Sequence, residues 1–183
     1  MKMVVGIAGG TAGGKSTFCE KLKKALDGYR VQMLHMDFYF KDVKDMPCVP
    51  SHINGRHYTD YNCPDTVDWD RYHADLQAAI ESDAQVVIAE GLLVLWDRET
   101  ADKLDMKIFV DCRADERIVR RIRRNQQWGL TFDEITDVYL NMVRFRHDQY
   151  VEPAKWTADV IVNGAGDTDM VCEMCASHIR SKL

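Results

Sequence analysis

The segment Gly9–Ser16 constrains the fold more than any other part of this chain. It reads GGTAGGKS and fits the pattern GxxxxGK[ST]. A short apolar run over residues 2–8 precedes it and predicts a buried strand. Phe18, Leu22 and Ala25 follow at helical spacing. A strand, a glycine-rich turn and a helix in this order are the context that the pattern requires.

Such a turn predicts a site for a polyphosphate. Glycines let backbone N–H groups come close to phosphate oxygens, and the start of the following helix adds the positive end of its dipole. We expect Lys15 to reach the β- and γ-phosphates and the Ser16 hydroxyl to ligate Mg²⁺. The expected nucleotide-binding residues of the turn are Gly9, Gly10, Thr11, Ala12, Gly13, Gly14, Lys15, Ser16 and Thr17.

The rest of the chain alternates between predicted strands and helices. We expect further strands at 30–36, 85–89, 106–111 and 158–162. We expect helices at 68–81, 113–127 and 132–151, and a last helix from the final strand to the end of the chain. This alternation predicts a three-layer α/β fold, in which helices cover both faces of a mostly parallel five-stranded sheet. At 183 residues the chain is one domain, 1–183. Residues 37–66 have no steady period and predict a long irregular loop of functional importance.

Composition excludes several classes of protein. A chain that is 46% hydrophobic and 29% charged is not disordered, and its net charge of −5 argues against a nucleic-acid coat protein. No apolar run approaches the roughly 18 residues of a membrane span, and the start of the chain resembles a strand rather than a signal peptide. Six scattered cysteines indicate free thiols. Cys172 and Cys175 form a CxxC, but no second ligand pair accompanies them, so we expect two thiols on a terminal helix rather than zinc.

Two carboxylates are candidates for the chemistry. Asp37 follows a predicted strand at its carboxyl end, where parallel sheets bind ligands, and aromatic residues flank it. We expect it to accept the proton of an acceptor hydroxyl, although a turn aspartate is the simpler alternative. Glu90 ends another predicted strand. It is expected to hold Mg²⁺ through water or to bind acceptor hydroxyls.

Five arginines lie within eight residues of a predicted helix, and Trp128-Gly129 interrupts the helix after them. Such a run is usually a solvated face, yet three of its members recur at i, i+4 and i+7. Arginine binds phosphate oxygens with two parallel hydrogen bonds, so an arginine-rich helical lid over about 120–132 is expected, with two of the five functional. The five are Arg117, Arg120, Arg121, Arg123 and Arg124.

The order and spacing of these motifs resemble the uridine kinase family of P-loop kinases, which includes nicotinamide riboside kinases and phosphoribulokinase-like enzymes. The resemblance runs nearly from end to end. Beyond the glycine-rich turn it rests on DFYFKD at 37–42, YNCPDTVD at 61–68, EGLL at 90–93, FVD at 109–111 with ADER at 114–117 and RR at 120–121, YVEP at 150–153 and ADVIV at 158–162.

The resemblance implies a P-loop NTPase fold and transfer of the γ-phosphoryl group of ATP, with Mg²⁺, to a hydroxyl of a nucleoside or related ribosyl compound. By position, Asp37 matches the catalytic base, Tyr61 and Asn62 match the pair that holds the acceptor, and Glu90 matches the acidic residue near metal and ribose. The implied catalytic residues are Asp37, Lys15, Arg117 and Arg120. The implied substrate-binding residues are Asp37, Tyr39, Phe40, Tyr61, Asn62 and Glu90, the metal-binding ones are Ser16 and Glu90, and Arg124 joins the ATP-binding set.

Three departures from the family pattern leave the acceptor open. Uridine kinases carry a base-reading hairpin where this chain has only Ser82-Asp83-Ala84, and nicotinamide riboside kinases also lack that hairpin. The acidic partner on the ribose is Asn62 here, and the R-G-R of the lid is replaced by Trp128-Gly129-Leu130. The alternatives are therefore a nicotinamide riboside, pantothenate or sugar kinase. The alternative from another functional class is a nucleotide-dependent switch without phosphotransfer. A GTPase is not favoured, because the guanine-binding tetrapeptide NKxD is absent.

The expected partner is a small-molecule hydroxyl acceptor, with no nucleic acid and no membrane, and the sequence leaves a homo-oligomer open. We expect a cytoplasmic protein. The alternative location is the peroxisome, because in a eukaryotic source the ending Ser181-Lys182-Leu183 would be a peroxisomal targeting signal.

Overall fold

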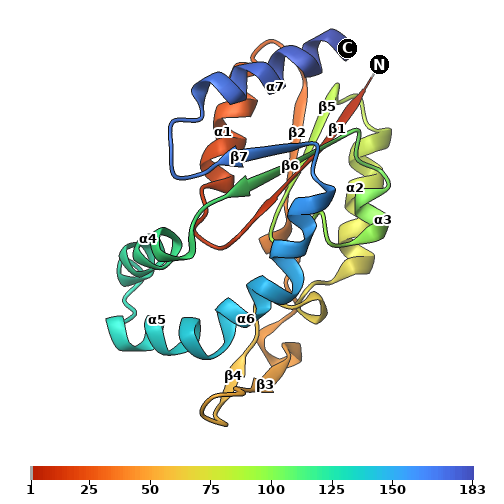
Figure 1. Cartoon of the computed structure of the whole chain (residues 1–183). Coiled ribbons are helices and arrows are strands. Elements are labelled where there is room, and N and C mark those ends of the chain that lie inside the picture. The colour runs from red at the N-terminus through yellow and green to blue at the C-terminus, as the bar shows by residue number, and fades with distance from the viewer. Residues whose placement is uncertain (1) are drawn as a thin grey trace.

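The computed structural model describes residues 2–183 and shows a five-stranded sheet between helical layers (Figure 1). The strand order is β2-β5-β1-β6-β7, and every neighbouring pair is parallel. The predicted α/β fold with a parallel five-stranded sheet is confirmed. The strands are β1 Met3–Gly9, β2 Val31–His35, β5 Val86–Glu90, β6 Met106–Asp111 and β7 Val160–Asn163.

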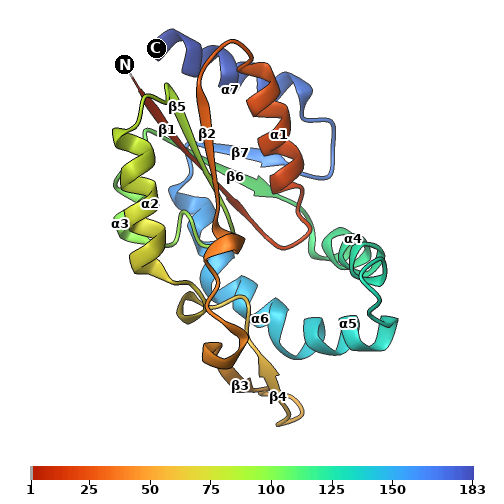
Figure 2. The same cartoon turned by 180° about the vertical axis from the view of Figure 1, so that it is seen from behind.

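Helices bury both faces of this sheet, which explains why β1 and β5 are continuous apolar runs rather than alternating ones. On one face, α1 (Lys15–Ala25) and α7 (Asp169–Lys182) pack against Val5 and Ile7 of β1. On the other, α2 (Trp69–Glu81) packs its Tyr72 and Leu76 against the neighbouring residues of the same strands. Figure 2 shows α1 and α7 on one side and α2 with α3 (Arg98–Ala101) on the other. The short helix α3 was not predicted.

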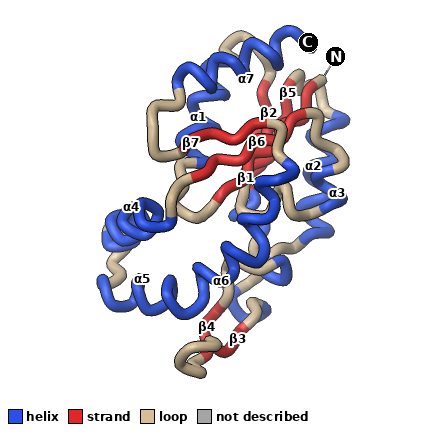
Figure 3. The backbone as a smooth tube through the Cα atoms, in the orientation of Figure 1, coloured by secondary structure: helices blue, strands red, loops and turns tan. Residues whose placement is uncertain are grey.

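A long helical arm leaves the sheet after β6 and returns to it at β7 (Figure 3). It begins with α4 (Ala114–Gln126), turns at Gly129 with a positive φ, and continues from α5 (Phe132–Val138). Two π-helical turns, η4 (Tyr139–Val143) and η5 (His147–Val151), flank the short α6 (Arg144–Arg146). A 3₁₀ segment, η6 (Glu152–Thr157), then leads back to the sheet. The predicted helices at 113–127 and 132–151 are therefore present, the second in irregular form.

The prediction of an irregular loop over 37–66 was wrong in part. A β-hairpin lies within it, formed by β3 (Cys48–Pro50) and β4 (His57–Thr59), and 3₁₀ turns surround the hairpin. Each of these strands has three residues, and β3 ends in a proline. Three residues are too few for an alternating apolar pattern to be recognised in the sequence. The turns are η1 Met36–Tyr39, η2 Val43–Asp45 and η3 Pro64–Thr66.

The C-terminal helix α7 faces the core with its cysteines. Cys172 and Cys175 are buried there together with Cys19 of α1, as two thiols on one helix face. The helix extends to Lys182, and Leu183 packs against the same core. Over residues 2–183, no helix combines the length and the apolar character that crossing a bilayer requires.

Candidate active site

The turn between β1 and α1 has the geometry of a phosphate-binding loop. Gly14 stands directly before α1 with a φ of 98°, a conformation in which side chains are strained. A Cβ on Gly9 would lie 2.3 Å from the carbonyl oxygen of Val110, so only glycine lets the loop leave the sheet so close to β6. The backbone N–H groups at the start of α1 therefore face the space above the sheet.

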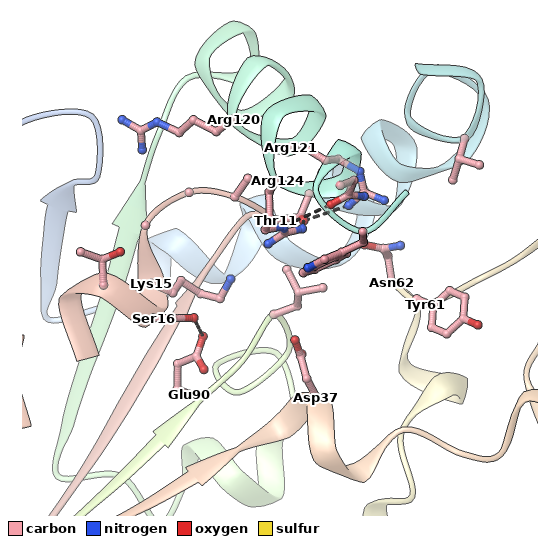
Figure 4. A pocket seen from close by; sticks show the side chains of 18 of the residues that line it. Thr11, Lys15, Ser16, Asp37, Tyr61, Asn62, Glu90, Arg120, Arg121 and Arg124 are labelled. Atoms are coloured by element: carbon pink, nitrogen blue, oxygen red, sulfur yellow. Dashed lines mark hydrogen bonds between the residues drawn. The ribbon is translucent and has the colours of Figure 1, made fainter. Parts of the chain in front are cut away.

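Lys15 and Ser16 project from the first turn of α1 into that space. Lys15 is buried, and its Nζ donates a hydrogen bond of 3.3 Å to the carbonyl oxygen of Gly10. The Ser16 hydroxyl donates to Oε1 of Glu90 over 3.3 Å. Figure 4 shows the ammonium group of Lys15 pointing into the pocket above this Ser16–Glu90 pair.

Two carboxylates meet at the carboxyl ends of β2 and β5, as the sequence predicts. Glu90 ends β5 and is buried, and its second oxygen, Oε2, lies 3.0 Å from Nδ1 of His35 at the end of β2. Asp37 follows in η1. Gly91 makes this approach possible, because a Cβ there would lie 2.4 Å from Cβ of Met36. Figure 4 shows the Asp37 carboxylate pointing into the pocket.

The electrostatic surroundings of Asp37 suit a base. Burial raises the pKa of its carboxyl above the ordinary value and outweighs Lys15, which lowers it; nearby Glu90 raises it further. Arg124 and His35 act in the same direction as Lys15. A carboxylate with a raised pKa accepts a proton more readily than an ordinary aspartate.

Arginines of α4 reach the loop from above. Arg121 and Arg124 both donate to the hydroxyl oxygen of Thr11, over 3.0 and 3.4 Å. The guanidinium of Arg124 also lies 5.0 Å above the ring of Trp128. Burial lowers the pKa of both arginines, and neither forms an ion pair with a carboxylate within residues 2–183. Two guanidinium groups without an anionic partner among the described residues, beside a glycine-rich loop, form an anion-binding surface.

Arg120 contacts the far side of the loop. Its guanidinium donates to the carbonyl oxygen of Gly164 over 2.8 Å and to Glu116 over 3.3 Å. Gly164 follows β7 and packs directly on the phosphate loop. Arg120 therefore links α4 to the loop after β7, which in turn contacts the phosphate loop. Figure 4 shows its side chain directed away from Asp37.

The structure does not place Arg117 among the residues that line the pocket, and its expected catalytic role stays a prediction. Its side chain is buried under the loop, where Nε donates to the carbonyl oxygen of Cys112 over 2.9 Å. A Cβ on Gly10 would lie 2.6 Å from Nη1 of Arg117. Arg117 and Arg121 lie on the same face of α4, but Arg117 is one turn closer to the sheet. At Arg121 this face meets the pocket, and at Arg117 it meets the underside of the loop. Arg117 therefore packs against the underside of the loop.

Residues before and after the hairpin form another wall of the pocket. Phe40, Tyr61 and Asn62 line the pocket there, and the rings of Phe40 and Tyr61 lie 6.1 Å apart. Tyr39 does not line it, contrary to expectation. Its ring is buried against Tyr72, and its hydroxyl donates to Asp75. Successive residues of a turn point in different directions, so only one of the aromatic neighbours of Asp37 at 39 and 40 could face the pocket.

The pocket that these groups enclose has a volume of about 740 Å³, within the range of small-molecule sites. Sequence reasoning missed Leu92, Asn125, Val138 and Met142 in its wall and treated Trp128 only as an interruption of the lid helix. Leu92 lies in the turn after β5, and Val138 and Met142 lie on the arm, where an apolar side chain carries no sequence signal that separates a pocket wall from a core. The full lining is Thr11, Ala12, Gly13, Gly14, Lys15, Ser16, Thr17, Asp37, Phe40, Tyr61, Asn62, Glu90, Leu92, Arg120, Arg121, Arg124, Asn125, Trp128, Val138 and Met142.

The donor set fits Mg²⁺ and a nucleoside triphosphate. Ser16 and Glu90 place hydroxyl and carboxylate oxygens 3.3 Å apart beside the loop, and such hard oxygens are the ligands that Mg²⁺ prefers. Lys15, Arg121 and Arg124 supply positive charge around the same space. Phosphate oxygens and water would supply the remaining ligands of the metal ion.

The comparisons with known proteins agree with this geometry. Residues 56–171 match the model of the phosphoribulokinase / uridine kinase family. The chain is 32% identical to a uridine kinase from Deinococcus deserti, covering 98% of this chain and 96% of the relative. It is 31% identical to a uridine kinase from Clostridium tetani, covering 99% and 96%.

A solved structure called a "possible uridine kinase" from Bacillus stearothermophilus shares the fold. It superposes with a TM-score of 0.62 at 18% sequence identity, covering 88% of this chain and 89% of that one. Phosphate loop, paired carboxylates and arginine-rich arm thus occur together in a chain whose sequence matches relatives nearly from end to end. The chain belongs to the phosphoribulokinase / uridine kinase family.

Proposed function

We propose that this protein is an ATP-dependent kinase that transfers the γ-phosphoryl group to a primary hydroxyl of a nucleoside. One observation carries the proposal. The carboxylate of Asp37, whose pKa is raised, faces the same pocket as Lys15 of the phosphate loop, and Tyr61 and Asn62 line the same pocket. A nucleotide switch has no use for a carboxylate of raised pKa in a pocket that Phe40 and Tyr61 also line.

The proposed reaction uses the residues as follows. The acceptor hydroxyl loses its proton to Asp37 as its oxygen forms a bond to the γ-phosphorus, and the bond from that phosphorus to the β–γ bridging oxygen breaks. Lys15, Arg121 and Arg124 hold the oxygens on which negative charge accumulates. Mg²⁺ held by Ser16 and Glu90 would neutralise charge on the phosphates. ADP and the phosphorylated acceptor then leave.

The acceptor is the part of the proposal that the fold constrains least. The relatives are named uridine kinases, which favours a pyrimidine nucleoside. However, α2 ends at Glu81 and β5 begins at Val86, so no hairpin lies between them. The alignment with the Deinococcus deserti relative spans 204 positions, more than the 183 residues of this chain. The relative therefore carries residues that this chain lacks.

A panel of acceptors in one ATP-consumption assay tests the function. Uridine, cytidine, nicotinamide riboside, pantothenate and a hexose are each added to the protein with ATP and Mg²⁺. We expect consumption with one of the nucleosides and none without an acceptor. Asp37→Asn keeps the size of the side chain and should lower turnover about 100-fold or more while ATP binding persists. Consumption of ATP that is independent of every acceptor would refute a kinase.

We also propose that the protein works in the cytoplasm, where ATP and nucleosides are available. Fractionation of source cells tests this, and enrichment in a membrane-enclosed organelle would refute it. A homo-oligomer stays a prediction from the family resemblance, and light scattering of the purified protein measures it.

A further inference from the structure

The β3–β4 hairpin packs against the helical arm, far along the sequence from it. In Figures 1 and 2 the hairpin lies beside the arm at the end of the molecule away from the sheet. Val49 of β3 and Tyr58 of β4 pack against a small apolar cluster formed by Tyr139, Met142 and Val143. The hairpin is therefore an integral part of the tertiary structure and not a free surface loop.

Polar bonds fasten the hairpin to the arm. The Tyr58 hydroxyl donates to Oδ2 of Asp137 over 2.7 Å and accepts from the Asn54 side chain over 2.8 Å. On the next turn, the Asn141 side chain donates to Oδ1 of Asp137 over 2.9 Å, and Ser51 donates to Asn141 over 3.3 Å. The Asp137 carboxylate thus receives a bond from the hairpin on one oxygen and from the arm on the other.

A second link joins the arm to the residue directly before the acceptor wall. Asp60 is fully buried, and its Oδ2 accepts a hydrogen bond of 2.6 Å from Nε of Arg146. Its other oxygen, Oδ1, accepts the backbone N–H of Asn62 over 2.8 Å. This carboxylate therefore fixes the backbone of an acceptor-side residue relative to the arm.

The arm itself forms part of the same pocket. Val138 and Met142 line it, and they are neighbours of Asp137 and Asn141 in sequence. No residue of 48–59 lines the pocket. The hairpin can therefore influence the acceptor only by holding the two walls, Tyr61–Asn62 on one side and Val138–Met142 on the other, at a fixed separation.

We propose that the β3–β4 hairpin is a clamp that sets the width of the acceptor half of the pocket, with Tyr58 and Asp137 as its positioning residues. The inference rests on the proposed function in one respect, namely that the acceptor binds between these walls. The ATP half is built from the phosphate loop and α4, neither of which the clamp bonds to. Loss of the Tyr58–Asp137 bond should therefore weaken acceptor binding and leave ATP binding unchanged.

A double-mutant cycle tests the clamp. Tyr58→Phe removes only the hydroxyl, Asp137→Ala removes the carboxylate, and the double variant removes both. We expect each single variant to raise the KM for the acceptor about fivefold, as the loss of one ordinary hydrogen bond would. The double variant should raise the acceptor KM by less than the product of the two single effects, because both single variants remove the Tyr58–Asp137 bond. The KM for ATP should stay within about twofold of wild type in all three.

A matched control and a second measurement separate positioning from general damage. Tyr29→Phe removes a hydroxyl that forms no hydrogen bond to another described residue and lies outside the pocket lining, so it should change neither KM. In wild type, bound acceptor should slow amide hydrogen exchange over 57–62, and Tyr58→Phe should abolish this protection while the thermal midpoint changes little.

The outcomes distinguish the clamp from the proposed function. Wild-type turnover together with an unchanged acceptor KM in both single variants refutes the clamp alone. Equal rises in the KM for ATP and for acceptor would assign the hairpin a purely structural role. Wild-type protein that turns over no acceptor refutes the proposed function, and the clamp is refuted with it.

Discussion

The contact between Gly164 and the phosphate loop gives the sharpest quantitative prediction. Gly164 follows β7, and a Cβ on it would lie 2.1 Å from the carbonyl oxygen of Gly13 and 2.8 Å from Cγ1 of Val110. Its backbone N–H donates to the carbonyl oxygen of Asp111 over 2.6 Å, and its own carbonyl oxygen accepts from Arg120. The residue is held on both sides and cannot move away alone.

Gly164→Ala should therefore displace the phosphate loop. Real Cβ contacts essentially never fall below 3.0 Å, so the loop backbone must shift by about 1 Å. Forcing a methyl group into packed backbone costs about 1–3 kcal/mol of unfolding free energy. A displacement of about 1 Å at the groups that orient the phosphates should lower kcat/KM for ATP about 100-fold.

Gly166→Ala is the matched control, two residues further along the same loop. Its Cβ would meet Nδ2 of Asn163 at 3.3 Å, and a side-chain amide can yield by a few tenths of an ångström. Its effect on unfolding free energy should stay within about 0.5 kcal/mol. Calorimetric titration with ADP, thermal unfolding and steady-state kinetics on both variants make the comparison. Wild-type ADP affinity and kcat/KM in Gly164→Ala would show that the loop does not depend on this contact.

Further predictions concern the charged groups of the site. Burial raises the pKa of Asp37, so the base becomes protonated at a higher pH than an ordinary aspartate does. As the pH is lowered, kcat should therefore begin to fall at a higher pH than it would with an ordinary aspartate as the base. Arg124→Gln removes a cation that lowers this pKa, so the acid limb of the kcat profile should move to higher pH, and a shift to lower pH would contradict the assignment. Chelation of Mg²⁺ should abolish turnover, and Ser16→Ala should raise the Mg²⁺ concentration for half-maximal rate without weakening metal-free ATP binding in calorimetry. Trp128→Leu removes the ring beneath Arg124 and should raise the KM for ATP up to about fivefold, whereas an unchanged KM would show that the stacking contributes nothing to binding.

The sequence predicted the sheet and the phosphate side of the pocket well, because both depend on local signals. Buried strands are short apolar runs, and the turn at Gly9–Ser16 needs glycine for reasons of backbone geometry within a few residues. The carboxyl ends of parallel strands share one edge, so Asp37 and Glu90 could be expected together from their positions alone.

The roles of the arginines could not be predicted in the same way. Arg117, Arg121 and Arg124 recur on one helix face, and the sequence treats them alike. The distance of each along α4 from the sheet places Arg117 under the loop and the other two above Thr11. That distance is set by how α4 leaves β6, which no local pattern encodes.

The chain by itself determined the α/β fold, the phosphate loop, the two strand-end carboxylates and the family resemblance, since these follow from periodicity and from residues close in sequence. Only the tertiary structure decided how the proposed acceptor half of the pocket is built. Tyr58 of the hairpin and Asp137 of the arm are 79 residues apart in sequence, and the bond between them exists only once the sheet has brought them together. Contacts of this kind depend on packing over the whole chain, so the wall of the acceptor site becomes visible only in the folded protein.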